Sequence, residues 1–405
     1  MNKPITCDIF CAVIDNFGDI GVCWRLAKQL VHEHDMTVRL WVDDLSSFRR
    51  LHPAICLDMP IQHCFGVEIR HWSSIFLELP FSKVEPAQLV IEAFACKLPE
   101  CYVTAMVAQE CKSIWINLEY LSAEEWVAEC HCLPSPNPSL PITKYFFFPG
   151  FTLQTGGLLL ERDLIARRDA FQSDLHTQAA FWQVLGVPLP KPDEVRVSLF
   201  CYENIALPEL FSTWTNANNP ILCLVPEDCV LPQVAAYFGR ELAVAGDILR
   251  RGNLEVRVLP FIEQERYDEL LWACDINFVR GEDSCVRAQW AGKPFVWHIY
   301  PQQDNVHINK LSAFRELYCS ELKPDATQAL YRLWQEWNIG QSGCQTTSTS
   351  LKPAWNEYWE HIAQLQKHAR EWSQHLSGNS LVLNLLNFAQ KIDRIRGLEC
   401  KLDLR

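Results

Sequence analysis

The chain has 405 residues, a formal charge of −13 and 49% hydrophobic residues, including 15 Trp and 21 Phe. This length exceeds one ordinary hydrophobic core, so we expect two domains, and the aromatic content excludes a disordered chain. The acidic balance disfavours a nucleic-acid-binding protein, which usually presents a basic patch, and is compatible with a basic or arginine-presenting partner.

Short apolar strands alternate with helices through the first half of the chain. The expected strands are 7–13, 37–42, 89–92, 113–118 and 145–148. This alternation is typical of a parallel sheet with helices on both faces. The proline-rich stretch 133–141 predicts an irregular surface loop.

The alternation restarts after the turn-rich stretch 186–192, where we place the domain linker. The expected strands of the second half are 196–202, 221–225, 256–259, 276–280 and 295–298. The pattern predicts an α/β protein of two Rossmann-like domains, 1–185 and 186–379, that face a central cleft. Residues 339–351 predict a flexible loop, and an amphipathic segment, 355–395, follows with a break near 377–379.

The 18 cysteines include no Cys-x-x-Cys pair, and several fall inside apolar patterns. This usage predicts small buried side chains in a reducing compartment. The cluster Cys130-His131-Cys132 lacks a second ligand pair at zinc spacing, so we expect no metal. The N-terminus passes directly into a strand and no long apolar stretch follows, so we expect a cytoplasmic protein without a signal peptide.

Residues 15–22, with the sequence DNFGDIGV, join the first expected strand to the first expected helix. Ligands of open α/β sheets bind at the carboxyl ends of the strands, so this turn predicts a functional site. Its glycines permit tight backbone geometry and the close approach of a substrate.

Seven short motifs match, in order, those of a known enzyme family. They are 15–26 (DNFGDIGVCWRL), 117–121 (NLEYL), 147–151 (FFPGF), 155–157 (TGG), 200–203 (FCYE), 260–264 (PFIEQ) and 278–284 (FVRGEDS). Together they resemble the bacterial protein-arginine rhamnosyltransferases that modify translation elongation factor P. The combination is specific, whereas any one motif alone is weak.

The resemblance implies a GT-B glycosyltransferase fold and inverting transfer of L-rhamnose from dTDP-β-L-rhamnose to one arginine of elongation factor P. It implies that the reaction needs no metal and no cofactor besides this donor. It also implies an acceptor-binding N-terminal domain and a C-terminal helix of about 380–405 that packs back on that domain. We expect a monomer without nucleic-acid or membrane partners. The same fold permits a small-molecule glycosyltransferase or nucleotide-sugar epimerase, and a non-catalytic partner of the factor is a third possibility.

By resemblance, Asp19 is the general base and Asp15 its orienting partner. Arginine is a poor nucleophile because its guanidinium stays protonated, and carboxylates match that planar group in bidentate geometry. Both side chains lie on one turn, so both can reach one guanidinium, and Asp19 can take a proton during or after C–N bond formation. The structural alternative makes Asp19 the N-cap of a helix that begins near Ile20 and Asp15 a turn residue.

The motif 280–284 also follows an expected strand and opens a helix, expected at 285–291. A helix N-terminus presents N–H groups to a phosphate, so the amides of Asp283 and Ser284 are expected on the donor diphosphate, although either residue can also act as an N-cap. Arg280 either neutralises the diphosphate or is structural. Glu282, the third catalytic candidate, would repel a phosphate, so we expect it on the ribose or in a network that assists the leaving group.

The thymine base needs an aromatic platform and an amide partner. By family position these are Tyr202, Phe261, Tyr267 and Gln264, although Phe261 also fits a core aromatic. The remaining donor contacts are expected from Phe17, Gly18, Gly281 and Gln303.

Gln303 stands with Gln302 and Asn305 in a broad GT-B pattern, and all three fit polar loop residues equally. His298 and His307 are expected in structural or substrate-orienting roles.

Acceptor contacts are expected from Asp15, Asn117 and Glu119, with Tyr120 beside them. The last three follow an expected strand of the N-terminal domain. A purely structural role for Glu119 remains the alternative.

Overall fold

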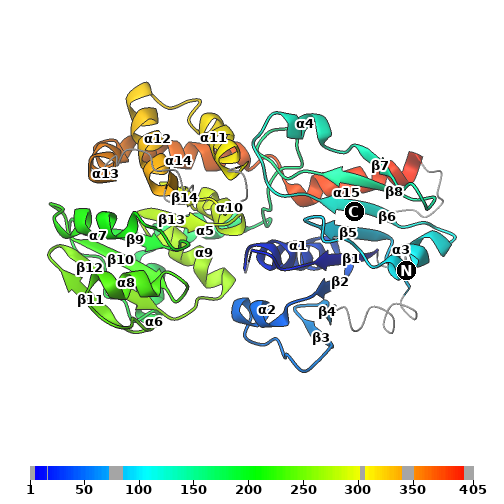
Figure 1. The fold of residues 1–405 in the computed structure, drawn as a ribbon, viewed down its shortest axis with the longest axis horizontal. Coiled ribbons are helices and arrows are strands. Elements are labelled where there is room, and N and C mark those ends of the chain that lie inside the picture. Colours follow the sequence, from blue (N-terminus) through cyan, green and yellow to red (C-terminus); the bar gives the residue numbers. More distant parts are fainter. Residues whose placement is uncertain (1–4, 16, 73–84, 302–305, 340–350, 396–405) are drawn as a thin grey trace. The chain divides into compact units, whose positions relative to one another are not determined.

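The computed structural model describes residues 5–15, 17–72, 85–301, 306–339 and 351–395 (Figure 1). The chain divides into two α/β units. Unit 1 comprises Met1–Arg162 and Leu376–Arg405, and unit 2 comprises Asp163–His375.

Unit 1 is built on a sheet with the strand order β3-β4-β2-β1-β5-β6-β8-β7. Its strands are β1 (Thr6–Cys11), β2 (Thr37–Val42), β3 (Ile61–Cys64), β4 (Val67–His71), β5 (Leu89–Ala93), β6 (Ile114–Leu118), β7 (Pro134–Pro136) and β8 (Thr143–Phe147). The central strands pair in parallel. Among the described strands of this sheet, only β3 with β4 and β7 with β8 pair antiparallel. β5 and β6 are buried along their whole length, as expected for parallel strands covered on both faces.

The loop predicted over 133–141 is partly wrong, because Pro134–Pro136 forms the edge strand β7. Proline cannot donate a ladder hydrogen bond, but an edge strand has one side without a neighbour, so proline is tolerated there.

Helix α1 (Gly18–His34) buries an apolar face that includes Cys23, Leu26 and Leu30. The other helices of unit 1 are α2 (Leu45–Leu51), α3 (Glu100–Ala108), α4 (Trp126–Cys130) and α15 (Leu381–Ile395). α15 contacts α1 and β6 and runs beside β8 (Figure 1). The ring of Phe388 on α15 packs against those of Tyr145 and Phe147 of β8. The remainder of the expected C-terminal helix, 396–405, lies outside the described residues.

A buried carboxylate ties the centre of the first sheet together. Asp8 of β1 is 0% exposed and accepts hydrogen bonds from Arg39 Nε at 2.6 Å, from Trp41 Nε1 at 3.0 Å and from the Ala87 amide at 3.0 Å. The hydroxyl of Tyr102 donates to the same carboxylate. These contacts join β1, β2 and α3 to the chain that enters β5.

Unit 2 carries a second sheet with the strand order β11-β12-β10-β9-β13-β14. Its strands are β9 (Val195–Leu199), β10 (Ile221–Pro226), β11 (Ile248–Arg251), β12 (Leu254–Leu259), β13 (Ile276–Arg280) and β14 (Phe295–His298). β11 pairs antiparallel with β12, and the other described pairings are parallel.

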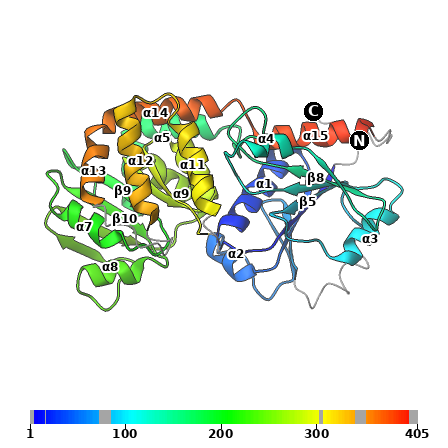
Figure 2. The same cartoon turned by 45° about the horizontal axis from the view of Figure 1, so that its top comes forward.

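The helices of unit 2 cover this sheet (Figure 2). They are α5 (Leu164–Ser173), α6 (Leu175–Val184), α7 (Leu207–Thr215), α8 (Leu231–Tyr237), α9 (Gln264–Ala273), α10 (Asp283–Ala291), α11 (Val306–Tyr318), α12 (Pro324–Ile339), α13 (Leu351–Glu360) and α14 (Ile362–Leu376). The expected break near 377–379 is present between α14 and α15. Most of the expected loop, 340–350, lies outside the described residues.

The division between the units falls at Arg162/Asp163, before the boundary expected at 185/186. α5 and α6 belong to unit 2 because their side chains pack there. The ring of Phe171 lies 5.8 Å from that of Trp272, and Arg168 Nη1 donates to the Trp290 carbonyl at 2.7 Å. The turn-rich stretch 186–192 therefore leads from α6 into β9 inside unit 2.

No helix in the described part of the chain is long and apolar enough to cross a bilayer. The described residues also contain no cluster of three or more His, Cys, Asp or Glu side chains suited to a metal ion. The cysteines that fall in apolar patterns, such as Cys7, Cys11 and Cys223, are buried free thiols, as their positions predicted.

Candidate active site

The turn from β1 into α1 holds Asp19 in place through main-chain amides. Asp19 Oδ2 accepts hydrogen bonds from the Ile14 amide at 2.8 Å and the Asp15 amide at 2.9 Å, and the residue is 2% exposed. Hydrogen bonds from amides, together with the N-terminal end of the helix dipole, stabilise an ionised carboxylate. The turn is therefore suited to hold an ionised carboxylate at the carboxyl end of β1.

The alternative in which Asp19 caps the helix is wrong. α1 begins at Gly18, and its N-cap residue is Phe17, whose side chain makes no capping hydrogen bond. Asp19 is the second helical residue, and its carboxylate reaches back to the two preceding amides of the turn.

Asp15 is half-buried and lies against Gly18. The Gly18 amide donates to the Asp15 carbonyl at 2.6 Å, and a Cβ on Gly18 would stand 2.8 Å from Asp15 Oδ2. Glycine thus lets the Asp15 carboxylate fold over the start of α1. Phe17, also half-buried, has its ring 5.1 Å from the Arg50 guanidinium carbon of α2.

The structure adds Asp43, which the sequence analysis did not select, to this turn. It follows β2, and its Oδ1 accepts a hydrogen bond from the Val13 amide at 2.9 Å. Burial raises the pKa of Asp43 above its ordinary value. The sequence did carry a signal for Asp43, because an acidic residue directly after the expected strand 37–42 is a candidate for the carboxyl edge of the sheet.

The predicted acceptor residues lie at the same edge of the first sheet, because β1, β5 and β6 are neighbours. The prediction that Asn117 follows the strand is wrong, because Asn117 is buried within β6, whereas Glu119 and Tyr120 do follow β6. Asn117 Nδ2 donates to Glu119 Oε1, and Asn117 Oδ1 accepts from the Ala95 amide at 3.2 Å. The ring of Tyr120 stacks on that of Phe94, with 4.6 Å between centroids.

The loop after β5 carries backbone strain. Phe94, Ala95 and Lys97 have φ values of 56°, 54° and 57°, in the left-handed region that non-glycine residues rarely adopt. Such residues cluster at functional sites, where the surrounding structure must hold them. The contacts of Asn117 with Ala95 and of Tyr120 with Phe94 link this strained loop to the predicted acceptor residues.

In unit 2, the turn from β13 into α10 carries the motif of 280–284. Gly281 takes a left-handed φ of 63°, Glu282 is the N-cap residue without a side-chain capping bond, and α10 begins at Asp283 rather than at 285. The Ser284 hydroxyl donates to the Arg280 carbonyl. The alternative in which Asp283 or Ser284 is the N-cap is therefore wrong, because Glu282 occupies the N-cap position and both residues lie inside α10.

Several predicted donor residues gather at this turn. Gln264, the first residue of α9, donates from Nε2 to Asp283 Oδ2 at 3.2 Å. Tyr267, one turn later, is buried, and burial raises the pKa of its hydroxyl. Phe261 is half-buried on the segment that enters α9, so it is not a full core residue.

Arg280 is held by protein groups. It is 4% exposed, its Nη1 lies 2.6 Å from Asp228 Oδ2, and its guanidinium carbon lies 4.4 Å and 4.7 Å from the ring centroids of Phe200 and Tyr202. Asp228 neutralises its charge, which favours the structural role over diphosphate neutralisation. Arg280 thereby positions Tyr202, a predicted platform for the base. Phe200 belongs to the motif 200–203 but had no assigned role, and Asp228, which follows β10, lies in none of the motifs.

His298 is fully buried below Tyr202, with 5.3 Å between ring centroids. Burial, with smaller contributions from Arg280 and His307, lowers the pKa of His298 to about 3. His307 is also buried, at 1% exposed. A neutral His298 in this position suits the structural role.

We expect His298 to make unit 2 less stable in acid. Its pKa rises to about 6.5 on unfolding, so below that pH the unfolded chain binds a proton at this residue and the folded chain does not. The free energy of unfolding therefore falls as the pH drops below about 6.5. At pH 5 this residue should lower the free energy of unfolding by about 2 kcal/mol relative to pH 7.5, which urea unfolding at the two pH values measures.

His298→Asn should flatten that pH dependence. The exposed His176→Asn should leave it unchanged. Equal slopes in the parent and His298→Asn would contradict the assigned pKa.

Three predicted or considered residues of the donor loop, Gln302, Gln303 and Asn305, lie outside the described residues. The structure brings a different side chain to the site: Lys310 of α11, whose Nζ lies 2.9 Å from Glu282 Oε1. The sequence offered no motif that marked Lys310.

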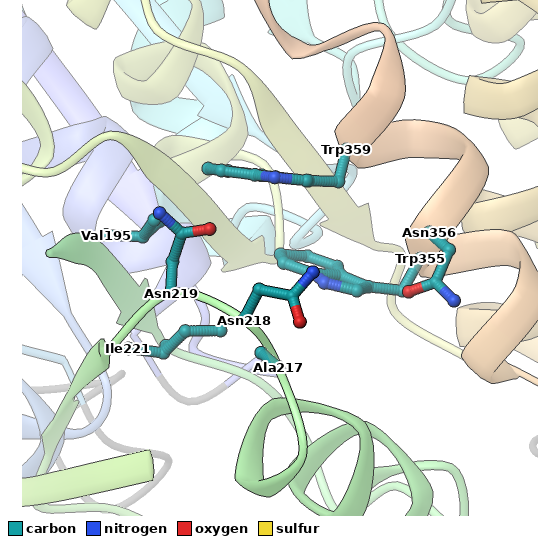
Figure 3. A pocket seen from close by; sticks show the side chains of 8 residues that line it. All are labelled: Val195, Ala217, Asn218, Asn219, Ile221, Trp355, Asn356 and Trp359. Carbon is teal, nitrogen blue, oxygen red and sulfur yellow. The ribbon is translucent and has the colours of Figure 1, made fainter. Parts of the chain in front are cut away.

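A pocket of about 80 Å³ lies elsewhere in unit 2 (Figure 3). It is lined by Val195, Ala217, Asn218, Asn219, Ile221, Trp355, Asn356 and Trp359. Val195 and Ile221 are the first residues of β9 and β10, whereas the predicted donor residues follow the carboxyl ends of strands. This pocket is therefore not the predicted donor site.

Two α/β units with parallel-rich sheets, each with predicted site residues near the carboxyl ends of its strands, are the architecture of a GT-B glycosyltransferase fold. The structure resembles a solved glycosyltransferase from Rickettsia africae, with a TM-score of 0.53 at 8% identity, over 98% of this chain and 100% of that one. At this identity the likeness shows the fold alone.

Residues 7–390 match the family described as elongation-factor P (EF-P) rhamnosyltransferase EarP, and the chain belongs to that family. It is 48% identical to a protein-arginine rhamnosyltransferase of Pseudomonas putida, over 91% of this chain and 93% of that protein. It is 46% identical to the Pseudomonas aeruginosa protein of the same name, over 90% and 93%. A solved structure described as the basis for EarP-mediated arginine glycosylation of translation elongation factor EF-P has a TM-score of 0.67 and 36% identity, over 95% of this chain and 99% of that one.

Proposed function

We propose that this chain is a protein-arginine rhamnosyltransferase that acts on translation elongation factor P. The observation that carries the proposal is the Asp19 carboxylate, held by two amides beside Asp15 in a member of this family. A pair of carboxylates at the end of a strand is suited to hold and orient a guanidinium. We place the reaction in the cytoplasm, with the factor.

The proposed donor is dTDP-β-L-rhamnose, and the proposed reaction is a single displacement that inverts the anomeric carbon without a metal. An arginine nitrogen forms a bond to that carbon while the bond to the dTDP oxygen breaks. Asp19 takes the proton that the guanidinium loses as the C–N bond forms, and Asp15 orients the guanidinium. We propose that the modified factor then acts on ribosomes stalled at polyproline stretches.

Donor binding is assigned to unit 2. The N-terminal amides of α10 would stabilise the charge that develops on the leaving diphosphate. Tyr202, Phe261 and Tyr267 would hold the base, with Gln264 at its edge. Glu282 would contact the sugar side of the nucleotide or assist the leaving group.

Tandem mass spectrometry of recombinant elongation factor P, incubated with this protein and dTDP-β-L-rhamnose, tests the proposal. A single deoxyhexose on one arginine is expected. If the factor stays unmodified while the folded protein binds dTDP, the acceptor or the sugar is wrong. If dTDP also fails to bind, the donor assignment is wrong.

A further inference from the structure

Lys310 and Glu282 form an ion pair at the N-terminal end of α10. Their Nζ and Oε1 atoms are 2.9 Å apart, and the two side chains are 13% and 18% exposed. Glu282 is the N-cap residue of α10, and Lys310 lies in the second turn of α11. The pair thus brings a cation from α11 to the turn where the donor diphosphate is proposed to bind.

This turn holds more negative charge than a diphosphate site should tolerate. Glu282 and Asp283 are adjacent carboxylates, and like charges in a partly buried site destabilise a bound phosphate. The Gln264 amide orders Asp283 but carries no charge. Nearby guanidinium groups are engaged by other carboxylates, Arg280 by Asp228 at 2.6 Å and Arg287 by Asp268 at 2.7 Å.

We propose that Lys310 is a positioning residue of the donor site, which fixes the Glu282 carboxylate and cancels its charge beside the diphosphate. The inference rests on the proposed function, because it takes a nucleoside diphosphate as the ligand. It explains how a carboxylate can stand at a phosphate-binding helix terminus and still contact the nucleotide.

Lys310→Met should weaken dTDP binding to the full chain about tenfold, measured by isothermal titration calorimetry. Thymidine, which has no phosphate, should bind within about twofold of the parent. A structural defect would weaken both ligands, and a partly exposed ion pair contributes little to stability, so the variant should fold. The loss of dTDP affinity should shrink at high salt, because it is electrostatic.

The double variant Lys310→Met/Glu282→Gln separates this role from a direct phosphate contact. Glutamine keeps an oxygen that can accept a hydrogen bond from the nucleotide but removes the negative charge, so dTDP affinity should return to within about threefold of the parent. If the double variant binds as weakly as Lys310→Met alone, Lys310 does not act through Glu282, and the inference is overturned.

Lys144→Met is the matched control, because Lys144 forms a similar ion pair with Glu92 in unit 1, at 3.1 Å. It should leave dTDP affinity unchanged. If Lys310→Met binds dTDP as tightly as the parent, the inference is also overturned, but the assignment of dTDP-β-L-rhamnose as the donor stands. Failure of the parent itself to bind dTDP would instead overturn the donor assignment, and this inference with it.

Discussion

Asp19→Asn is expected to lower the rate of rhamnose transfer by about 10³-fold, within the range of a lost general base. An asparagine oxygen can still accept the hydrogen bonds from the amides of Ile14 and Asp15, so the turn should keep its shape. What the variant loses is the negative charge and the capacity to take the guanidinium proton. Single-turnover transfer to elongation factor P, with dTDP affinity measured in parallel, separates chemistry from donor binding.

Asp44→Asn is the matched control for Asp19→Asn. Asp44 also accepts hydrogen bonds from two amides at the start of a helix in unit 1, those of Ser46 at 2.8 Å and Ser47 at 3.2 Å. Asparagine is as good an N-cap as aspartate, so both stability and transfer should stay close to those of the parent. Transfer by Asp19→Asn at the parent rate would show that Asp19 is not the base.

Asp8→Ala is expected to lower the free energy of unfolding of unit 1 by about 3–5 kcal/mol, the cost of breaking a buried ion pair by removing one partner. The substitution leaves the Arg39 guanidinium, the Trp41 indole N–H and the Tyr102 hydroxyl without their shared acceptor. Urea unfolding measures the loss. Because dTDP binding is assigned to unit 2, the variant should still bind dTDP at urea concentrations that destabilise its unit 1.

Glu68→Ala provides the comparison on the same sheet. Glu68 pairs with Arg70 but is 24% exposed, and partly exposed pairs contribute less than about 1 kcal/mol. If Asp8→Ala costs no more than Glu68→Ala, the buried network around Asp8 does not hold the sheet together.

Local pattern determined much of this fold. The expected strand 7–13 corresponds to β1, and the helical spacing after residue 22 corresponds to α1, because side-chain periodicity is written into neighbouring residues. The motif 15–26, read with the others, also identified the family, which the comparisons confirm. Both successes rest on information that adjacent residues carry.

Local pattern did not predict the edge strands or the boundary between the two units. β3 and β11 are short, and each forms only because it pairs antiparallel with the strand that follows it. The sequence of α5 and α6 does not show which unit they cover. Tertiary contacts such as those of Phe171 with Trp272 and of Arg168 with Trp290 assign them to unit 2.

The sequence by itself determined the α/β class and the family, and it marked in each unit one turn that carries candidate site residues. The tertiary structure decided which charges meet: Arg280 with Asp228, and Lys310 with Glu282. Arg280 ends β13 whereas Asp228 follows β10, and Glu282 precedes α10 whereas Lys310 lies on α11. No local spacing therefore links the partners of either pair. Strand order and helix packing bring such residues together, and these depend on long-range contacts that a single sequence does not display.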